Sequence, residues 1–165
     1  MKTTQHKLVI TTPNDFEIHA TRDFDAPKEL VFEAFSRCEH LKRWWGQRTS
    51  ELSVCEMDFR VGGSWRRVVR SPDGSEHPFR GEFLEIIEPV KISETLIYDV
   101  EFARDFPAVE TITLEDIDGM TRLTAVVTHT TREGRDGHLH SGMEAGAAES
   151  YDRLEELLQA LQGKS

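Results

Sequence analysis

The order in which strand and helix patterns follow one another restricts the fold of this chain most. From Leu52 to Thr130 the sequence reads as strands joined by short turns, and from there to about Gln162 it reads as a helix. Strands that follow each other through short turns pair as an antiparallel meander. One face of such a sheet must be buried, and only the C-terminal helix is long enough to cover it. We therefore expect a curved sheet that wraps around one long helix.

Alternating apolar residues and turn residues give the boundaries of the expected strands. The first strand is expected at 16–24, ahead of the helices, and the others form the series described above. Those later strands are expected at 52–59, 62–70, 79–87, 91–100, 108–117 and 121–130. The sequence therefore predicts an α+β fold with about six to seven strands in one sheet.

The helices are marked by periodic apolar residues and by residues that suit helix ends. One or two short helices are expected after the first strand, over 25–35 and 39–44. Pro27 suits the first helical turn, and Gly46 suits the end of the second helix. The final helix is expected to begin between Thr131 and Asp136 and to continue without a break.

Composition limits the kinds of partner that this protein is expected to have. The chain has 165 residues, 38% of them hydrophobic, and we expect a single domain over 1–165 with its core at about 16–161. Its formal charge of −10 argues against nucleic acid, whose phosphates need Lys and Arg. No apolar run approaches the roughly 20 residues that a membrane span requires. We therefore expect a globular protein with no nucleic-acid partner and no membrane span.

The N-terminus and the cysteines bear on the cellular compartment. The segment MKTTQHKLVI has no apolar signal-peptide core and no cleavage site. Cys38 and Cys55 are the two cysteines, and two do not make a disulfide framework. We therefore expect a cytoplasmic protein whose two thiols are reduced and either buried or inert.

The last helix is thin in its middle and bulky at its C-terminal end. Gly142 and Gly146 lie within the expected helix, although a helical glycine costs about 1 kcal/mol relative to alanine. Met143 and Ala147 share the face of the helix that is expected to meet the sheet. Small residues there allow either close packing or an apolar space that could hold a ligand. From this pattern alone we favour close packing, because protein interiors are normally filled.

Several motifs in this chain resemble one bacterial family. They are Ala-Pro-x-x-x-Val-Phe at 26–32, Trp-Trp-Gly at 44–46, Gly-Gly-x-Trp at 62–65 and the helical segment GMEAGAAESYDRLEELL. Together they are similar to the family named after the activators of the heat-shock protein 90 ATPase. Its superfamily also holds START lipid-transfer domains, aromatic polyketide cyclases and plant pathogenesis-related proteins. The resemblance extends from Phe16 to Leu161.

The resemblance implies the helix-grip fold, in agreement with the architecture expected above. It also implies a cavity between the sheet and the long helix, which shifts our preference from close packing to a pocket. The chain departs from its relatives at one position. Many of them have tryptophan directly after the second glycine of the helix, where this chain has Ala147. The departure puts the volume of the pocket in question and leaves the expected fold unchanged.

The residues expected to bind a ligand lie on strands, on the last helix or beside the Trp-Trp motif. Of the two adjacent tryptophans, one is expected in the core and the other at the mouth of the pocket, the alternative being that both are structural. The apolar candidates are Trp45, Phe59, Trp65, Phe83, Tyr98, Met143 and Ala147.

Three polar residues fall among apolar neighbours on the expected strands. Glu94 is a candidate pocket acid with a raised pKa, the alternative being a strand-end or salt-bridged glutamate. His129 could hold a ligand or act as a base, although a core histidine with satisfied hydrogen bonds is the more common case. Arg67 either faces solvent or points inward, where it must be paired or meet an anionic ligand.

Three functions are compatible with these features. The first is binding of a small apolar or amphipathic molecule, whose identity the sequence does not encode. The second is an enzyme of the cyclase or hydrolase type, with Glu94 and His129 as the only acid or base candidates and no complete catalytic site. The third is a chaperone partner, as the family name suggests. The spacing of histidines and cysteines predicts no metal site, no cofactor motif is present, and an uncovered strand edge could support a homodimer.

Overall fold

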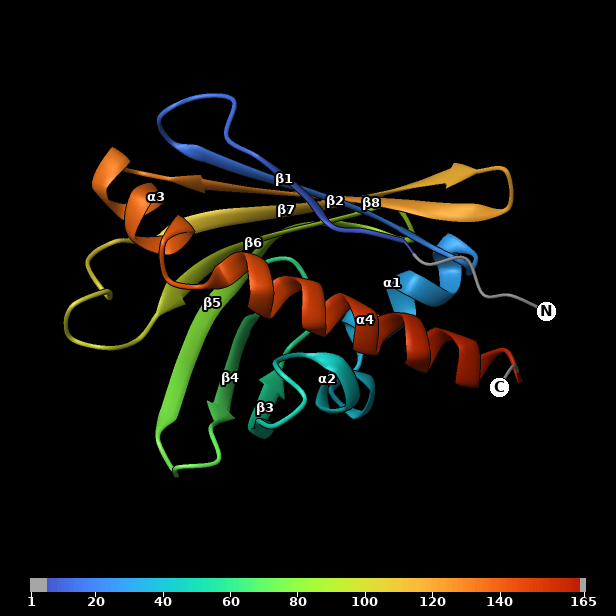
Figure 1. The fold of residues 1–165 in the computed structure, drawn as a ribbon, viewed down its shortest axis with the longest axis horizontal. Helices are drawn as coiled ribbons and strands as arrows, with labels where there is room; N and C mark the ends of the chain where they lie inside the picture. The colour runs from blue at the N-terminus through green and yellow to red at the C-terminus, as the bar shows by residue number, and fades with distance from the viewer. Residues whose placement is uncertain (1–5, 164–165) are drawn as a thin grey trace.

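The computed structural model describes residues 6–163, which form eight strands and four helices (Figure 1). The strands are β1 (Val9–Thr11), β2 (Glu17–Phe24), β3 (Glu51–Met57), β4 (Ser64–Arg70), β5 (Glu76–Ile87), β6 (Lys91–Tyr98), β7 (Ala108–Ile117) and β8 (Met120–His129). The helices are α1 (Lys28–Ser36), α2 (Cys38–Trp44), α3 (Arg132–Leu139) and α4 (Met143–Leu161). The fold is α+β, as expected. None of the described helices is long and apolar enough to cross a bilayer.

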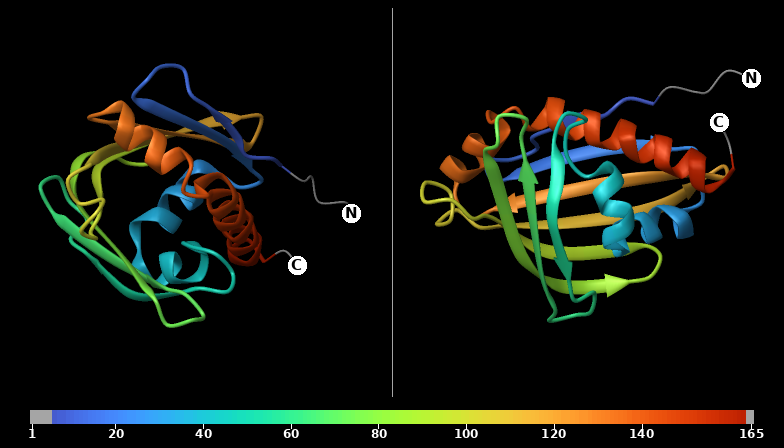
Figure 2. Two further views of the ribbon diagram at one scale, coloured as in Figure 1. Left: turned by 60° about the vertical axis from the view of Figure 1, so that its left-hand side comes forward. Right: turned by 90° about the horizontal axis from the view of Figure 1, so that it is seen from below.

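All eight described strands belong to one antiparallel sheet, in the order β1-β2-β8-β7-β6-β5-β4-β3. The strands from β3 to β8 form the expected meander, and β2 closes it by pairing with β8. The sheet curls around an interior, and α4 runs along its open side, with α1 and α2 near one end (Figures 1 and 2). This arrangement is the helix-grip architecture. It leaves β1 and β3 as the two edge strands.

The main hydrophobic core lies where α1, α2 and the C-terminal half of α4 meet the sheet. Phe24, Trp44 and Leu154 are among its large, fully buried side chains. The indole N–H of Trp44 donates a hydrogen bond of 3.0 Å to the carbonyl of Ala34, so its one polar atom is satisfied. A second, smaller cluster of Ile18, Ala108 and Val127 lies apart from this core. The interior is therefore divided into two apolar regions.

The C-terminal helical segment is interrupted, and the expectation of one continuous helix is wrong at this point. Helix α3 ends at Leu139, and α4 begins at Met143. Gly142 is the N-cap residue of α4 and has a φ of 87°, in the left-handed region that glycine adopts readily. Of the two glycines noted in the sequence, only Gly146 lies inside α4. The glycine-rich stretch therefore marks a turn between two helices as well as a thin helix.

The described sheet has one strand more than the upper expected number. Strand β1 is only three residues long and precedes Phe16, where the core was expected to begin. In β5 the pairing register with β6 shifts between Phe83 and Glu85. Such a bulge changes which face the following residues occupy and explains why both faces of this strand carry apolar residues.

The two cysteines form a disulfide bond, and the expectation of two reduced thiols is wrong. Cys38 is the first residue of α2 and Cys55 lies in β3, and their Cα atoms are 5.8 Å apart. The bond ties a helix at the end of the curled sheet to its edge strand. One of the two arguments for a cytoplasmic location is thereby removed, because it relied on reduced cysteines.

Candidate functional site

Three ionisable side chains lie on the inner face of the sheet, between the two apolar regions. They are Arg67 on β4, Glu94 on β6 and Glu110 on β7, and the last two are directly opposite each other in the β6–β7 ladder. Along β7, Glu110 lies between Ala108 of the small cluster and Ile112 of the main core. Arg67 and Glu94 are only 5% and 4% exposed. We call these three residues the inner polar group.

Arg67 points inward, so the solvent-facing alternative for this residue is wrong. Its guanidinium carbon lies 4.4 Å from the ring centre of Trp65 and 5.2 Å from that of Trp45. One guanidinium nitrogen lies 3.9 Å from the sulfur of Met57, and Nε has no partner among the described residues. Burial lowers the pKa of Arg67, while the nearby carboxylates oppose that effect. Stacking on two indoles stabilises the cation and leaves the edge of its plane for hydrogen bonding.

The two carboxyl groups accept no hydrogen bond from any described residue, and Oε2 of Glu94 is both buried and unpartnered. Burial raises the pKa of Glu94 to about 7; the positive charge of Arg67 acts against this shift and the negative charge of Glu110 adds to it. Burial likewise raises the pKa of Glu110. Both carboxyl groups therefore favour their protonated form more than a solvated glutamate does, and Glu94 is only partly ionised near pH 7. Glu94 therefore has the surroundings of a pocket acid.

Replacing Glu94 with glutamine is expected to stabilise the protein at high pH and to have little effect at low pH. The carboxyl group ionises near pH 4.5 when solvated but near pH 7 in the folded state. Between these values the folded state holds the extra proton, so the contribution of Glu94 to stability falls as the pH rises through this window. Each pKa unit is worth about 1.4 kcal/mol, so the advantage of Glu94→Gln should grow by roughly 3 kcal/mol.

Urea unfolding at several values between about pH 4 and about pH 8 measures this difference. Glu115→Gln is the matched control, because Glu115 is an exposed glutamate on the same strand as Glu110. A stability difference between Glu94→Gln and the unchanged protein that stays constant with pH would contradict the buried, proton-holding state of Glu94.

Aromatic rings surround the inner polar group. Phe79 on β5 contacts Trp45 at 5.3 Å and stacks on Tyr98 at 5.0 Å between ring centres. Phe59 and Phe83 form a separate edge-to-face pair at 5.1 Å. Trp45, Phe59, Phe79 and Tyr98 are half-buried, whereas Trp65 and Phe83 are buried. Five of the predicted aromatic candidates are therefore packed around this part of the inner face.

Gly81 explains how Trp65 fits against the sheet. A Cβ atom at this position would lie 2.0 Å from the carbonyl oxygen of Thr95 and 2.6 Å from the indole nitrogen of Trp65. Only glycine therefore lets the indole lie on the backbone of β5 at this point. The indole N–H of Trp65 is buried and has no hydrogen-bond partner among the described residues.

Helix α4 contributes one predicted residue to each apolar region. Ala147 packs against the main core, and Met143 packs against the small cluster. A Cβ atom added at Gly146, beside Ala147, would meet no atom within 4 Å. Tyr151, one turn further along, has a hydroxyl group with no described hydrogen-bond partner. Burial and the negative charge of Glu110 raise the pKa of Tyr151, so this hydroxyl also borders the inner polar group.

The described contacts of the His129 ring are with His138 and not with the inner polar group. Its Nε2 atom is 3.0 Å from Nδ1 of His138, which joins the end of β8 to α3, while its own Nδ1 is buried without a partner. Burial lowers the pKa of both rings, that of His138 to about 4. Both histidines are thus neutral at pH 7. The expectation of a satisfied core histidine holds for one ring nitrogen of His129 and not for the other.

Sequence reasoning missed Phe79, Glu110 and Tyr151. Glu110 was open to the same argument as Glu94, because it too alternates with apolar residues along its strand. Phe79 begins the expected strand 79–87 and was not among the candidates. Tyr151 lies in the bulky part of the last helix, and no sequence signal places its hydroxyl near Glu110.

Described residues line two hollows on the outer surface that are considered as alternative sites. One of about 340 Å³ is lined by Arg43, Arg48, Arg153, Glu156 and Leu157. The other, of about 410 Å³, is lined by His6, Lys7, Val9, Thr21, Arg22, Asp23, Arg122 and Thr124. None of the predicted ligand-binding residues lines either hollow. Both are surrounded by charged side chains and do not suit an apolar ligand.

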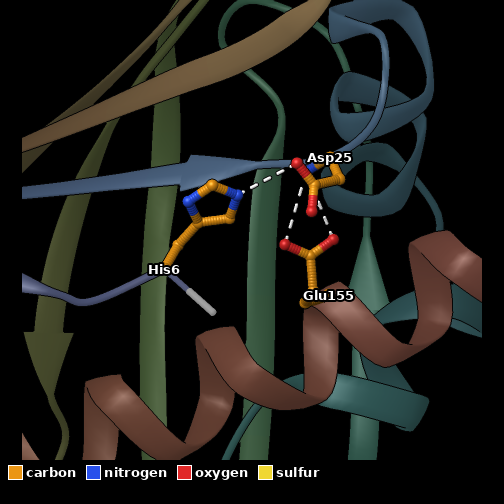
Figure 3. A group of neighbouring side chains, drawn as sticks. All are labelled: His6, Asp25 and Glu155. Atoms are coloured by element: carbon orange, nitrogen blue, oxygen red, sulfur yellow. Dashed lines mark hydrogen bonds and ion pairs between the residues drawn. The ribbon is translucent and has the colours of Figure 1, made fainter. Parts of the chain in front are cut away.

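A cluster of His6, Asp25 and Glu155 resembles a metal site in its residue types (Figure 3). The ring of His6 lies 3.0 Å from a carboxylate oxygen of Asp25, and Glu155 accepts hydrogen bonds from the backbone N–H of Asp25 and from Gln159. Arg22 is already paired with Glu155 at 3.4 Å. The carboxylate of Glu155 is thus already paired with a cation and accepts hydrogen bonds from its neighbours. The cluster therefore suits a structural role, in which it connects the N-terminal segment, the residues before α1 and helix α4.

Comparisons with known proteins agree with this architecture. A protein from Rhodobacter sphaeroides has a TM-score of 0.85 and 24% identity, over 94% of this chain and 99% of that protein. A protein from Nitrosomonas europaea has a TM-score of 0.80 and 26% identity, over 92% of this chain and 99% of that protein. A protein from Silicibacter pomeroyi described as AHSA1 has a TM-score of 0.72 and 21% identity, over 88% of this chain and 99% of that protein.

No curated protein matches the chain. The sequence model described as "Activator of Hsp90 ATPase homolog 1-like protein" matches residues 25–159, from the start of the Ala-Pro motif region to near the end of α4. That span includes the inner polar group and the aromatic residues around it. The chain therefore belongs to the family of Activator of Hsp90 ATPase homolog 1-like proteins.

Proposed function

We propose that the protein binds a small amphipathic molecule between the inner face of the sheet and α4. The polar part of the molecule would meet Arg67, Glu94 and Glu110, and its apolar part would meet the aromatic rings beside them. The family and the fold support this proposal, since both are consistent with a START-like ligand-binding domain.

The observation that carries the proposal is a set of buried polar atoms without partners. Among the described residues these are Trp65 Nε1, Arg67 Nε, Glu94 Oε2 and His129 Nδ1. A buried polar atom without a hydrogen bond costs about 1–3 kcal/mol, so folded proteins rarely retain several of them close together. Three of the four atoms belong to the inner polar group or to the indole stacked on it. A ligand with its own donors and acceptors would recover this lost free energy.

The half-buried aromatic rings account for the apolar part of the ligand. Trp45, Phe79 and Tyr98 form a continuous series of ring contacts. Each of these side chains keeps an intermediate exposure although it lies beside a buried charged group. Removing their remaining apolar surface from water would favour binding by about 25 cal/mol for each Å² covered.

Filling the proposed space with an indole tests the function. Ala147→Trp restores the residue that many relatives have at this position, and it should fill the space without loss of stability. We expect this variant to bind the neutral fluorescent probe N-phenyl-naphthylamine at least about tenfold more weakly than the unchanged protein, a loss of about 1.4 kcal/mol. Fluorescence titration measures the affinity, and urea unfolding measures the stability.

Gly146→Ala is the matched control, because it adds a methyl group beside Ala147 where no atom lies within 4 Å. It should keep the probe affinity and should make α4 slightly more stable, by about 0.5–1 kcal/mol. Absence of probe binding by the unchanged protein, or full binding by Ala147→Trp, would reject the proposed function.

A second candidate function is acid–base catalysis on the bound molecule. The observation in its favour is the pKa of Glu94, which burial raises to about 7, within the range where a side chain both gives and takes protons efficiently. In this reading Glu94 is the acid or base, and Arg67 holds an oxygen of the substrate. Loss of turnover in Glu94→Gln with binding retained would support it, and unchanged turnover would reject it. His129 is not included, because its ring is engaged with His138.

A further inference from the structure

We infer that the ligand carries a protonated amine, and that Glu94 and Glu110 are the groups that bind it. This inference rests on the proposed function, because it assigns the chemical class of the molecule that enters the same site. It follows from the hydrogen-bond donors, the charges and the rings that surround the two carboxyl groups.

The two carboxyl groups receive no hydrogen bond within the site. Glu94 and Glu110 are directly opposite each other in the β6–β7 ladder, and no described residue donates a hydrogen bond to either carboxyl group. Arg67 has the nearest positive charge, but its guanidinium is not within 4.0 Å of a carboxylate oxygen and lies over the rings of Trp45 and Trp65. The unpartnered N–H groups of Trp65 and Arg67 are donors, but they do not reach the two carboxyl groups. An ammonium group has three N–H donors and no acceptor, so it suits two carboxyl groups that receive no hydrogen bond.

The site also has fewer positively charged side chains than acidic ones. The titratable groups that face the site are Arg67 from β4, Glu94 from β6, Glu110 from β7 and the hydroxyl of Tyr151 from α4. The tyrosine is neutral at pH 7, so two acids face one cation. At the end of β8, His129 and its partner His138 are neutral as well. One more cation would allow both carboxyl groups to ionise with their charges compensated.

The aromatic rings favour a cation joined to an apolar body. Trp45, Phe79 and Tyr98 follow one another beside the charged groups, and the face of an aromatic ring attracts a cation. The net charge of −10 attracts cations to the whole molecule. An anionic ligand would be attracted by Arg67 but repelled by the two carboxylates. Arg67 does not require an anion, because the edge of its guanidinium can donate hydrogen bonds equally well to a neutral oxygen of the ligand.

Binding of an amine should release protons. Near pH 7 Glu94 is only partly ionised, and the positive charge of the ligand favours the ionised form of both acids. The affinity of an amine should therefore rise between about pH 6 and about pH 8. A neutral ligand should show little change over that range, and an acidic ligand should take up protons and bind more weakly as the pH rises.

Three probes with the same ring system test the inference: naphthylethylamine, naphthylethanol and naphthylacetic acid. Calorimetric titration at about pH 7 in two buffers with different heats of ionisation gives both the affinity and the number of protons released. We expect the amine to bind about tenfold more tightly than the alcohol and to release protons, and the acid to bind most weakly.

Variants of the two acids complete the test. Glu94→Gln and Glu110→Gln should each bring the affinity for the amine to within about twofold of that for the alcohol. Glu115→Gln, an exposed glutamate on β7, should change neither affinity. Equal or tighter binding of the alcohol or the acid would overturn the inference while the proposed function stands. Absence of binding by all three probes would overturn both.

Discussion

Replacing Trp44 with alanine is expected to lower the free energy of unfolding by about 3–5 kcal/mol, whereas the same change at Trp45 should mainly weaken ligand binding. The two residues are adjacent in the sequence, but they occupy different surroundings. Trp44 is 1% exposed and packs against Phe35 and Tyr151, with ring centres 4.8 Å and 6.2 Å away. Removing its indole leaves a large cavity in the main core and an unpaired carbonyl group at Ala34.

Trp45 is half-buried, and its ring covers one face of Arg67 and contacts Phe79. Its removal should cost about 1–2 kcal/mol of stability, mostly from lost ring contacts. It should also let water reach the guanidinium of Arg67 and reduce the area available to the apolar part of a ligand. We therefore expect Trp45→Ala to bind N-phenyl-naphthylamine at least about tenfold more weakly.

Urea unfolding and probe titration of both variants separate the two roles. If Trp44→Ala does not fold, Trp44→Phe provides a milder change with an expected loss of about 1–2 kcal/mol. Equal losses of stability at the two positions would show that both tryptophans are structural. Unchanged probe affinity in Trp45→Ala would remove this residue from the binding site.

Breaking the disulfide bond is expected to have the next largest effect, a loss of about 3 kcal/mol. Cys38 and Cys55 are 17 positions apart, and the bond between them limits the freedom of that loop in the unfolded chain. The loop contains α2 and both adjacent tryptophans. Breaking the disulfide bond should therefore also make the segment around Trp45 less ordered and weaken probe binding.

Unfolding with and without a reducing agent measures the contribution of the bond, and the double variant Cys38→Ser/Cys55→Ser is its matched control. The reducing agent should lower the stability of the unchanged protein and should not affect the double variant. If the purified, unreduced protein has two free thiols, or if the reducing agent changes nothing, the expectation is contradicted.

Much of the fold could be predicted because the pattern of the chain is local. Alternating strands and short turns determine an antiparallel meander, and the amphipathic C-terminal segment is the element that can cover it. The turn at Gly142 could not be recognised, because Leu139 and Met143 lie four residues apart and keep the helical period across it. The disulfide bond was missed for a different reason: two cysteines in a short loop give no sequence signal that their Cα atoms approach each other.

The candidate site could be predicted only in part, because it depends on how the strands pair. Alternation with apolar residues identified Glu94, but the partner opposite it depends on the register between β6 and β7, which places Glu110 there. The direction of Arg67 was open for a similar reason. Its strand carries arginine on both faces, and only the contacts of its guanidinium with the rings of Trp65 and Trp45 identify the buried one.

The pairing of β2 with β8 has a consequence for how the chain folds. Glu17 and Thr128 are opposite each other in this ladder, although 111 positions separate them in the sequence. Contacts between such distant parts of a chain form late and slow the folding of a domain to milliseconds or seconds. During synthesis the segment that becomes β2 must wait until β8 has been made. Its apolar face, with Ile18 and Ala20, is exposed throughout that interval, so the newly made chain should be most prone to aggregate before β8 arrives.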